Sequence, residues 1–216
     1  MPPESETHKK RRAVQVVRQL ATLYPGEQCL LTHSDPFTLL IAVLLSAQTT
    51  DAAVNRISPT LFARWPDASS LAAASRQDVE QVIRTIGLYR SKARNCIACA
   101  QRLLSDFGGQ VPNTMDELIS LPGVGRKTAN LVLNGAFGKV CGIAVDTHVF
   151  RIAGRLGLTN GKTPSQVEAD LMRVYPRKYW SSINHMWVLF GREFCQARRP
   201  RCPQCPVGDL CPSYMA

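Results

Sequence analysis

Apolar residues of this 216-residue chain recur at the spacing of an α-helix. Val14, Val17 and Leu20 would share one helical face, and Leu118 and Leu121 repeat the spacing further along the chain. Sustained alternation of apolar and polar residues, which is typical of a half-buried β-strand, is absent from the sequence. The sequence therefore predicts an all-α fold.

Helix boundaries are marked by capping residues and breaks. Four polar residues followed by first-turn chemistry are expected to be helix N-caps: Asp35, Ser75, Thr114 and Thr163. Glycine and proline breaks then divide the chain into about ten helices joined by short loops. Only the first eight or so residues, which are polar and contain Pro2 and Pro3, are expected to be disordered.

The charge balance favours a phosphate-rich partner. Twenty-six Lys and Arg residues against sixteen Asp and Glu give a formal charge of +10, although a soluble protein with solvated basic faces is the simpler interpretation. The longest apolar run, Leu39 to Leu45, is too short for a membrane helix, and the polar N-terminus has no signal-peptide core. We therefore expect an intracellular chain without a membrane partner, whose eight cysteines are not paired as disulfides.

The segment from Leu121 to Asn130 predicts a glycine turn that leads into a helix over residues 128–137. Gly123 and Gly125 permit a tight turn and a close approach of the backbone to a ligand, with Val124 as an apolar plug between two helices. The N–H groups at the start of the second helix would suit a DNA phosphate. An ordinary helix-turn-helix corner is the alternative. The residues expected to contact DNA here are Gly123, Val124, Gly125, Arg126 and Thr128.

Lys127 is predicted in the first turn of that helix, where the helix dipole disfavours a cation. The same field favours the neutral amine, which is the form that attacks an electrophilic carbon. Asp146 follows an apolar run and precedes another predicted helix. Its carboxylate is therefore a candidate to act on the sugar whose carbon the amine would attack. The simpler interpretations are a phosphate contact for Lys127 and a plain N-cap for Asp146, and both stay open.

The segment from Leu121 to Asn130, together with Val145-Asp146-Thr147-His148, resembles the helix-hairpin-helix motif of the endonuclease III family of DNA glycosylases. The resemblance runs from about Pro36 to Cys211. By matching positions it implies that Lys127 is the nucleophile and Asp146 its partner. The implied activity is excision of oxidised pyrimidines from duplex DNA through a lysine Schiff base, followed by strand nicking at the abasic site through β-elimination.

The same resemblance implies a two-lobed helix-hairpin-helix glycosylase fold with the active site in the groove between the lobes. We expect a helical barrel domain over residues 29–140, with the hairpin at about 115–137. An iron-sulfur cluster domain would combine residues 1–28 with residues 141–216. The expected partner is double-stranded DNA with damaged bases or abasic sites, bound by a monomer in the cytoplasm or nucleoid.

Two more segments match the family pattern and imply further DNA contacts. Gln48 would enter the space left by the flipped nucleotide, and Leu88 would be an apolar wedge between base steps. A helix-capping glutamine and an ordinary helix-cap hydrophobic residue are the alternatives. Arg90 and Lys92 would suit backbone phosphates, or would simply be solvated.

Four cysteines near the C-terminus, separated by six, two and five residues, are close enough in sequence for their thiolates to converge on one metal centre. General chemistry makes structural zinc the default, whereas the family resemblance implies one [4Fe-4S] cluster. The expected ligands are Cys195, Cys202, Cys205 and Cys211.

Arg198, Arg199 and Arg201 lie between the first two of these cysteines and would form a phosphate clamp. A purely structural role, tying the C-terminal tail to the N-terminal helix, is the alternative for this loop. Cys96 and Cys99 are expected to be buried small hydrophobic residues. No role is assigned to Cys29, Cys141 and His148.

Two other functions remain open from the sequence. An adenine-type mismatch glycosylase shares the hairpin and the cluster, but that branch lacks a lysine nucleophile at the position of Lys127. A noncatalytic DNA-structure or redox sensor would need the hairpin, the cluster and the charge, but neither Lys127 nor Asp146.

Overall fold

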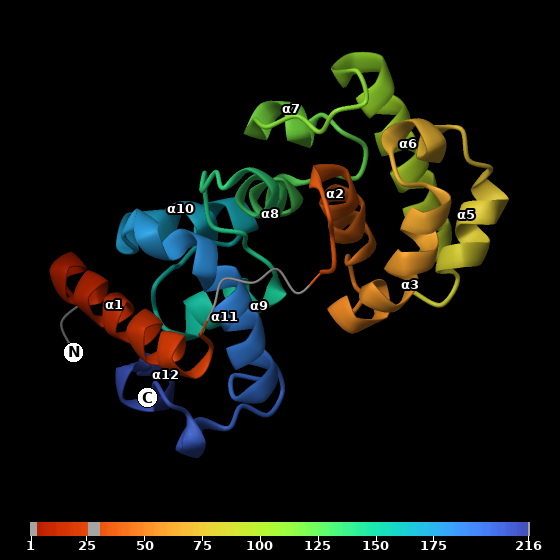
Figure 1. The fold of residues 1–216 in the computed structure, drawn as a ribbon. Coiled ribbons are helices and arrows are strands. Elements are labelled where there is room, and N and C mark those ends of the chain that lie inside the picture. Colours follow the sequence, from red (N-terminus) through yellow and green to blue (C-terminus); the bar gives the residue numbers. More distant parts are fainter. Residues whose placement is uncertain (1–3, 26–30, 216) are drawn as a thin grey trace. The chain divides into compact units, whose positions relative to one another are not determined.

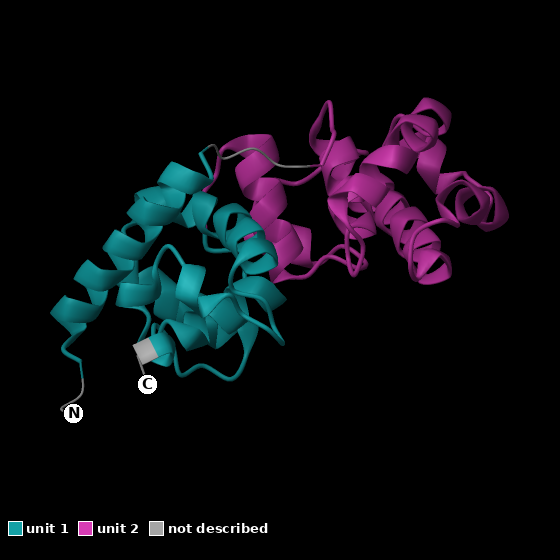
Figure 2. Cartoon of the chain, turned by 90° about the horizontal axis from the view of Figure 1, so that it is seen from below, with its two compact units in different colours: residues 1–28, 142–216 teal, residues 29–141 magenta. Residues whose placement is uncertain are grey.

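The computed structural model describes residues 4–25 and 31–215, and all regular elements among them are helical (Figure 1). The predicted all-α fold is confirmed. None of the described helices is long and apolar enough to cross a lipid bilayer. The chain divides into two compact units, one of residues 29–141 and one of residues 1–28 with 142–216 (Figure 2). The functions assigned above to the two domains stay predictions.

The unit of residues 29–141 is built on α2 (Pro36–Leu45), a helix that is apolar on every side. Its residues from Phe37 to Leu45 are all buried, as expected of a helix without a polar face. Asp35 and Thr38 form a capping box at its start, which confirms the predicted N-cap. The other helices of this unit are α3 (Asp51–Arg64), α4 (Ala68–Ala72), α5 (Arg76–Ile83), α6 (Tyr89–Phe107), α7 (Met115–Ile119) and α8 (Arg126–Phe137).

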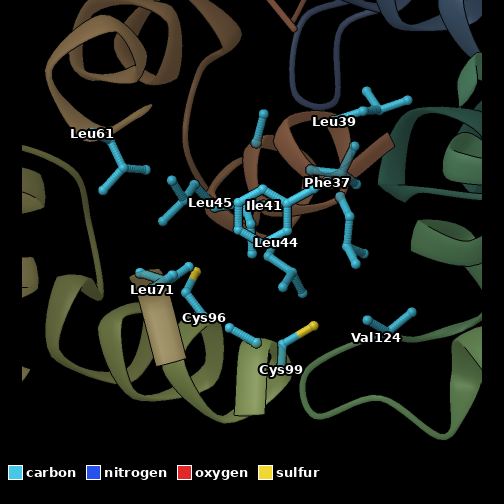
Figure 3. Close-up of a cluster of buried hydrophobic side chains, with 14 of the residues drawn as sticks. Phe37, Leu39, Ile41, Leu44, Leu45, Leu61, Leu71, Cys96, Cys99 and Val124 are labelled. Atoms are coloured by element: carbon cyan, nitrogen blue, oxygen red, sulfur yellow. The ribbon is translucent and has the colours of Figure 1, made fainter. Parts of the chain in front are cut away.

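Helices α3, α6 and α8 all contact α2. Cys96 and Cys99 of α6 lie in the resulting core, near Leu44 and Leu71 (Figure 3). Burial raises the pKa of both thiols, that of Cys99 to about 12. Both thiols therefore stay protonated and inert at neutral pH, and the prediction that they are buried small hydrophobic residues is confirmed.

The second unit joins the two ends of the chain around its own core. Helix α11 (Trp180–Glu193) contributes Trp187 and Phe190 to this core and packs against α1 (Glu6–Leu23) and α9 (Thr147–Arg155). The remaining elements of the unit are α10 (Pro164–Val174), the 3₁₀ turns η1 (Arg177–Tyr179), η2 (Cys202–Gln204) and η3 (Gly208–Leu210), and α12 (Pro212–Met215).

The start of α1 corrects the expectation of a disordered N-terminus. Ser5 is the N-cap of α1 and accepts a hydrogen bond from the backbone N–H of His8. Glu4 accepts from Arg12 Nη2 at 2.7 Å, and this guanidinium lowers the pKa of Glu4 to about 2. Residues 4–8 are therefore ordered by a cap and an ion pair that hydrophobic periodicity does not reveal. Residues 1–3 lie outside the described part of the chain, as does Cys29.

The remaining predicted caps are confirmed, since Ser75, Thr114 and Thr163 start α5, α7 and α10. The start of α8 was predicted two residues too late. Gly125 has an extended backbone and acts as the N-cap, and its carbonyl oxygen accepts from Ala129 N–H at 2.9 Å. Helix α8 therefore begins at Arg126.

Gly191 marks the tight contact between α11 and α9. An added Cβ would lie 2.5 Å from His148 Nδ1 and 3.0 Å from Arg151 Nη2. We expect Gly191→Ala to lower the free energy of unfolding by about 1–3 kcal/mol, because the His148 ring and the Arg151 guanidinium, which contact each other, must shift to make room. Urea denaturation measures this change.

Gly154→Ala is the matched control, since a Cβ on this glycine of α9 would meet nothing within 4 Å. Alanine should stabilise the helix there by about 0.5–1 kcal/mol. A Gly191→Ala variant as stable as the unmodified chain would contradict this description of the contact.

Candidate functional site

The hairpin between α7 and α8 is shaped by one glycine and one valine. Gly123 has a φ of +79°, and an added Cβ would lie 3.1 Å from Nδ2 of Asn95 on α6. Val124 is buried and its N–H donates to the carbonyl oxygen of Leu121 at 3.1 Å, so the predicted apolar plug is confirmed. Gly125 has an extended backbone, and an added Cβ on it would meet nothing within 4 Å. Its role within the chain is that of the N-cap of α8.

The first turn of α8 carries Arg126, Lys127 and Thr128, and the two cations are exposed. The N-cap Gly125 has no side chain to accept from the N–H groups of this turn, and the turn contains no acidic residue. Helix N-termini attract anions through these N–H groups and the helix dipole. The turn is therefore suited to bind a phosphate next to an exposed primary amine.

Asp146 is the N-cap of α9. Its Oδ1 accepts from the backbone N–H groups of His148 and Val149, each at 2.9 Å, which confirms the N-cap interpretation. The cap fixes the direction of a half-buried carboxylate. Lys127 belongs to the unit of residues 29–141 and Asp146 to the other unit, and their action on one sugar stays a prediction.

Gln48 and Leu88 both lie on exposed loops with left-handed backbones. Their φ angles are 53° and 58°, and among the described residues they are the only two residues other than glycine with a positive φ. The alternative that Gln48 caps α2 is wrong, because Ser46 is the C-cap of that helix. Leu88 is the N-cap residue of α6 but is 57% exposed, so it is not packed as an ordinary cap hydrophobic residue. Their contacts with DNA stay predictions.

The prediction that Lys92 is a surface lysine is wrong. Its side chain is neither solvated nor available to a phosphate, because the residue is only 5% exposed. Its Nζ donates to Thr49 Oγ1 at 2.5 Å. Burial lowers the pKa of Lys92. Arg90, by contrast, is exposed and lies over the ring of Tyr89.

The four candidate metal ligands line one cavity of about 90 Å³ in the second unit. They lie on residues 194–211, here called the cysteine segment, in which η2 and η3 are the only helical turns. Apolar residues such as Ile152, Phe190 and Val207 complete the lining. Burial raises the pKa of the Cys205 and Cys211 thiols, and the other cysteine thiols nearby contribute to both shifts. The four cysteines are not paired as disulfides.

Arginines hold the cysteine segment through its backbone. Arg155 of α9 donates to Gln196 O at 2.7 Å and to Cys195 Sγ at 3.3 Å. Arg151 donates to Cys195 O at 3.0 Å and also contacts His148 Nδ1, which gives the unassigned histidine a neighbour.

Arg12 of α1 is buried and donates to Leu210 O at 3.0 Å. These three arginines were not predicted from the sequence as contacts of the cysteine segment. One signal was present for Arg12, which lies four and eight residues before the buried Val16 and Leu20 and so falls on the apolar stripe of α1.

The three arginines expected to clamp phosphate are all exposed on the cysteine segment: Arg198, Arg199 and Arg201. Their exposure leaves them accessible to a polyanion. Within the described ranges, no three His, Cys, Asp or Glu side chains are spaced to hold one single metal ion.

Known proteins share both the sequence and this fold. The family model of the HhH-GPD superfamily base excision DNA repair proteins matches residues 41–177. An endonuclease III from Synechocystis sp. is 45% identical over 208 residues, which cover 96% of this chain and 95% of the relative. The fold and the hairpin thus place the chain in the class of helix-hairpin-helix base excision repair proteins.

Two solved structures are 44% identical to the chain, with a TM-score of 0.89, and each match covers 95% of it. One is described as a trapped endonuclease III–DNA covalent intermediate and the other as a non-covalent endonuclease III–DNA complex, and 97% and 96% of their chains are covered. The chain belongs to the endonuclease III family of the HhH-GPD superfamily. The predicted family resemblance is confirmed.

Proposed function

We propose that this chain is a bifunctional DNA N-glycosylase and abasic-site lyase of base excision repair. It excises oxidised pyrimidines from duplex DNA and then nicks the strand. The observation that carries the proposal is the exposed Lys127 in the first turn of α8, which is suited to bind a phosphate, in a chain that is 44% identical to an endonuclease III trapped covalently on DNA. The formal charge of +10 supports a DNA partner.

The neutral amine of Lys127 attacks the sugar C1′, and the bond from C1′ to the base breaks with its electron pair leaving on the base, which takes up a proton. Opening of the C1′–O4′ bond then yields an iminium between Nζ and C1′. The iminium acidifies the C2′ proton, whose removal expels the 3′ phosphate by β-elimination. Water releases the lysine and leaves a nicked strand.

Asp146 stabilises positive charge that develops on the sugar and helps to move protons. Its place as N-cap of α9 supports this role, because the two hydrogen bonds from His148 and Val149 hold the carboxylate in one orientation. A carboxylate held in advance needs no reorganisation when charge develops during the reaction.

The cysteine segment would hold one [4Fe-4S] cluster through Cys195, Cys202, Cys205 and Cys211. Each thiolate of such a cluster binds a different iron, so the four ligands surround a body larger than one ion. Four thiols around one cavity of about 90 Å³ fit this donor set. When bound, the cluster would cross-link the segment and hold its exposed arginines as a rigid phosphate clamp.

Borohydride trapping on a duplex with one oxidised pyrimidine tests the nucleophile. The unmodified chain should form a covalent complex with damaged but not with undamaged duplex. Lys127→Ala should form none, because it lacks the amine that forms the iminium. Lys139→Ala is the control, since that lysine lies just past α8 and is tied to Asn113 O at 3.0 Å.

A complex that persists in Lys127→Ala would contradict the assignment. Release of free base without any trapped complex would instead indicate a monofunctional glycosylase, such as the adenine type. Tight binding with neither product would indicate a noncatalytic sensor.

Substitutions of Asp146 separate its cap from its charge. Asp146→Asn keeps an oxygen that caps α9, so its stability should stay close to that of the unmodified chain, whereas its single-turnover rate should fall by about 10²–10⁴-fold. Asp146→Ala should in addition lose about 1 kcal/mol of stability in urea denaturation. An Asp146→Asn variant with an unchanged rate would show that this residue acts only as a helix cap.

Iron and sulfide analysis tests the cluster. The unmodified chain should contain about four iron atoms and absorb visible light, and Cys205→Ala should lose both because one ligand of the cluster is missing. Cys141→Ala, at an exposed cysteine in the other unit, should retain both. One zinc ion per chain in place of iron would overturn the assignment.

A further inference from the structure

The Gln48 loop (residues 46–50) and the Leu88 loop (residues 84–88) are neighbours in the unit of residues 29–141. An added Cβ on Gly87 would lie 3.7 Å from the carbonyl oxygen of Gln48. A left-handed backbone, which both Gln48 and Leu88 have, is strained for a residue with a Cβ. Such strain persists only where surrounding contacts fix the backbone, and it occurs most often at functional sites.

Lys92 joins the two loops through its main chain and its side chain. Its backbone N–H donates to the carbonyl oxygen of Leu88 at 3.0 Å. Its ammonium Nζ donates to the hydroxyl of Thr49, the residue after Gln48, at 2.5 Å. One residue of α6 is thus bonded to both loops next to their left-handed positions.

The position of Lys92 is unfavourable by itself. The side chain is buried, although an ammonium group is costly to remove from water. The residue also lies in the first turn of α6, where the helix dipole disfavours a cation. A neutral apolar residue would fill this position without either cost, so the bond to Thr49 is the feature that the lysine alone provides.

We propose that Lys92 is a positioning residue that holds the Gln48 and Leu88 loops at a fixed separation, so that both side chains enter a damaged duplex together. The inference rests on the proposed function and on the contacts that the family resemblance implies, in which Gln48 takes the space of the extruded nucleotide and Leu88 enters between base steps. Loops fixed in advance lose less conformational entropy on binding. Lys92 therefore acts on the extrusion of a nucleotide from duplex DNA and leaves the chemistry at Lys127 unaffected.

Lys92→Met tests this role because methionine keeps an unbranched apolar stem and removes the ammonium. Two quantities are measured: the affinity for lesion-containing against undamaged duplex, and the single-turnover lyase rate at an abasic site in single-stranded DNA. We expect the preference for the lesion duplex to fall by about tenfold or more, the loss of one hydrogen bond from a charged donor. The single-stranded rate should stay unchanged, because no paired nucleotide has to be extruded.

Thr49→Val removes the other partner of the same bond and should reproduce the loss. The double variant should be no worse than either single variant, as expected when two residues act through one interaction. Arg102→Ala is the control on the same helix, since Arg102 is exposed and pairs with Asp106 at 2.7 Å. It should behave as the unmodified chain does.

Each outcome decides the matter. If Lys92→Met does not fold, Thr49→Val carries the test. Unchanged lesion preference in the variants, or an equal loss of the single-stranded rate, overturns the positioning role. If the unmodified chain neither prefers the lesion duplex nor forms a covalent complex, the proposed function fails, which is distinct from a failure of the variants alone.

Discussion

Hydrogen bonds from three arginines to backbone carbonyl oxygens attach the cysteine segment to helices α1 and α9 of the unit formed by the two chain ends. The segment has only two 3₁₀ turns of its own. Arg151 and Arg155 attach its start to α9, and Arg12 attaches Leu210, next to the last cysteine, to α1. Each hydrogen bond from a charged donor contributes about 1.5–3 kcal/mol. Because Asp146 caps α9, the same helix orients the proposed catalytic carboxylate and carries two of these arginines.

The other unit uses one apolar helix for a similar purpose. Helix α2 is buried on every side, and α3, α6 and α8 rest on it. Three segments of this unit that are proposed to contact DNA adjoin these helices: the Gln48 loop follows α2, the Leu88 loop precedes α6, and the hairpin precedes α8. A rigid apolar core therefore carries the short exposed segments that are proposed to contact DNA. The residues that stabilise this unit are thus different from those proposed to recognise DNA.

Local patterns predicted most of the fold. Helical spacing gave the all-α class, and a side-chain oxygen followed by first-turn residues located caps such as Asp35 and Thr163. The start of α8 was predicted too late because Gly125 caps through its backbone, which leaves no side-chain signal. The order of residues 4–8 was missed because it depends on a pair eight residues apart, Glu4 with Arg12.

In the candidate site too, features that are local in sequence were predicted and contacts between distant residues were not. The hairpin and the cysteine spacing are local in sequence, so the motif and a metal-ligand set were predicted from them, whereas their roles were implied by the family resemblance. Lys92 was misplaced because its partner, Thr49, is 43 residues away, and no local pattern reports a contact of that range. Its position on the buried stripe of α6 with Cys96 and Leu103 was the available signal, since a cation on such a stripe must find a partner within the fold.

Peptide mapping of the borohydride-reduced protein–DNA complex gives the most direct test of the proposed chemistry. The complex formed with a duplex carrying one oxidised pyrimidine is digested, and mass spectrometry locates the amine that carries the reduced sugar. The sugar should be found on Nζ of Lys127 and on no other lysine. An adduct on a different amine, or strand nicking without any adduct, would contradict the assignment of Lys127 as the nucleophile.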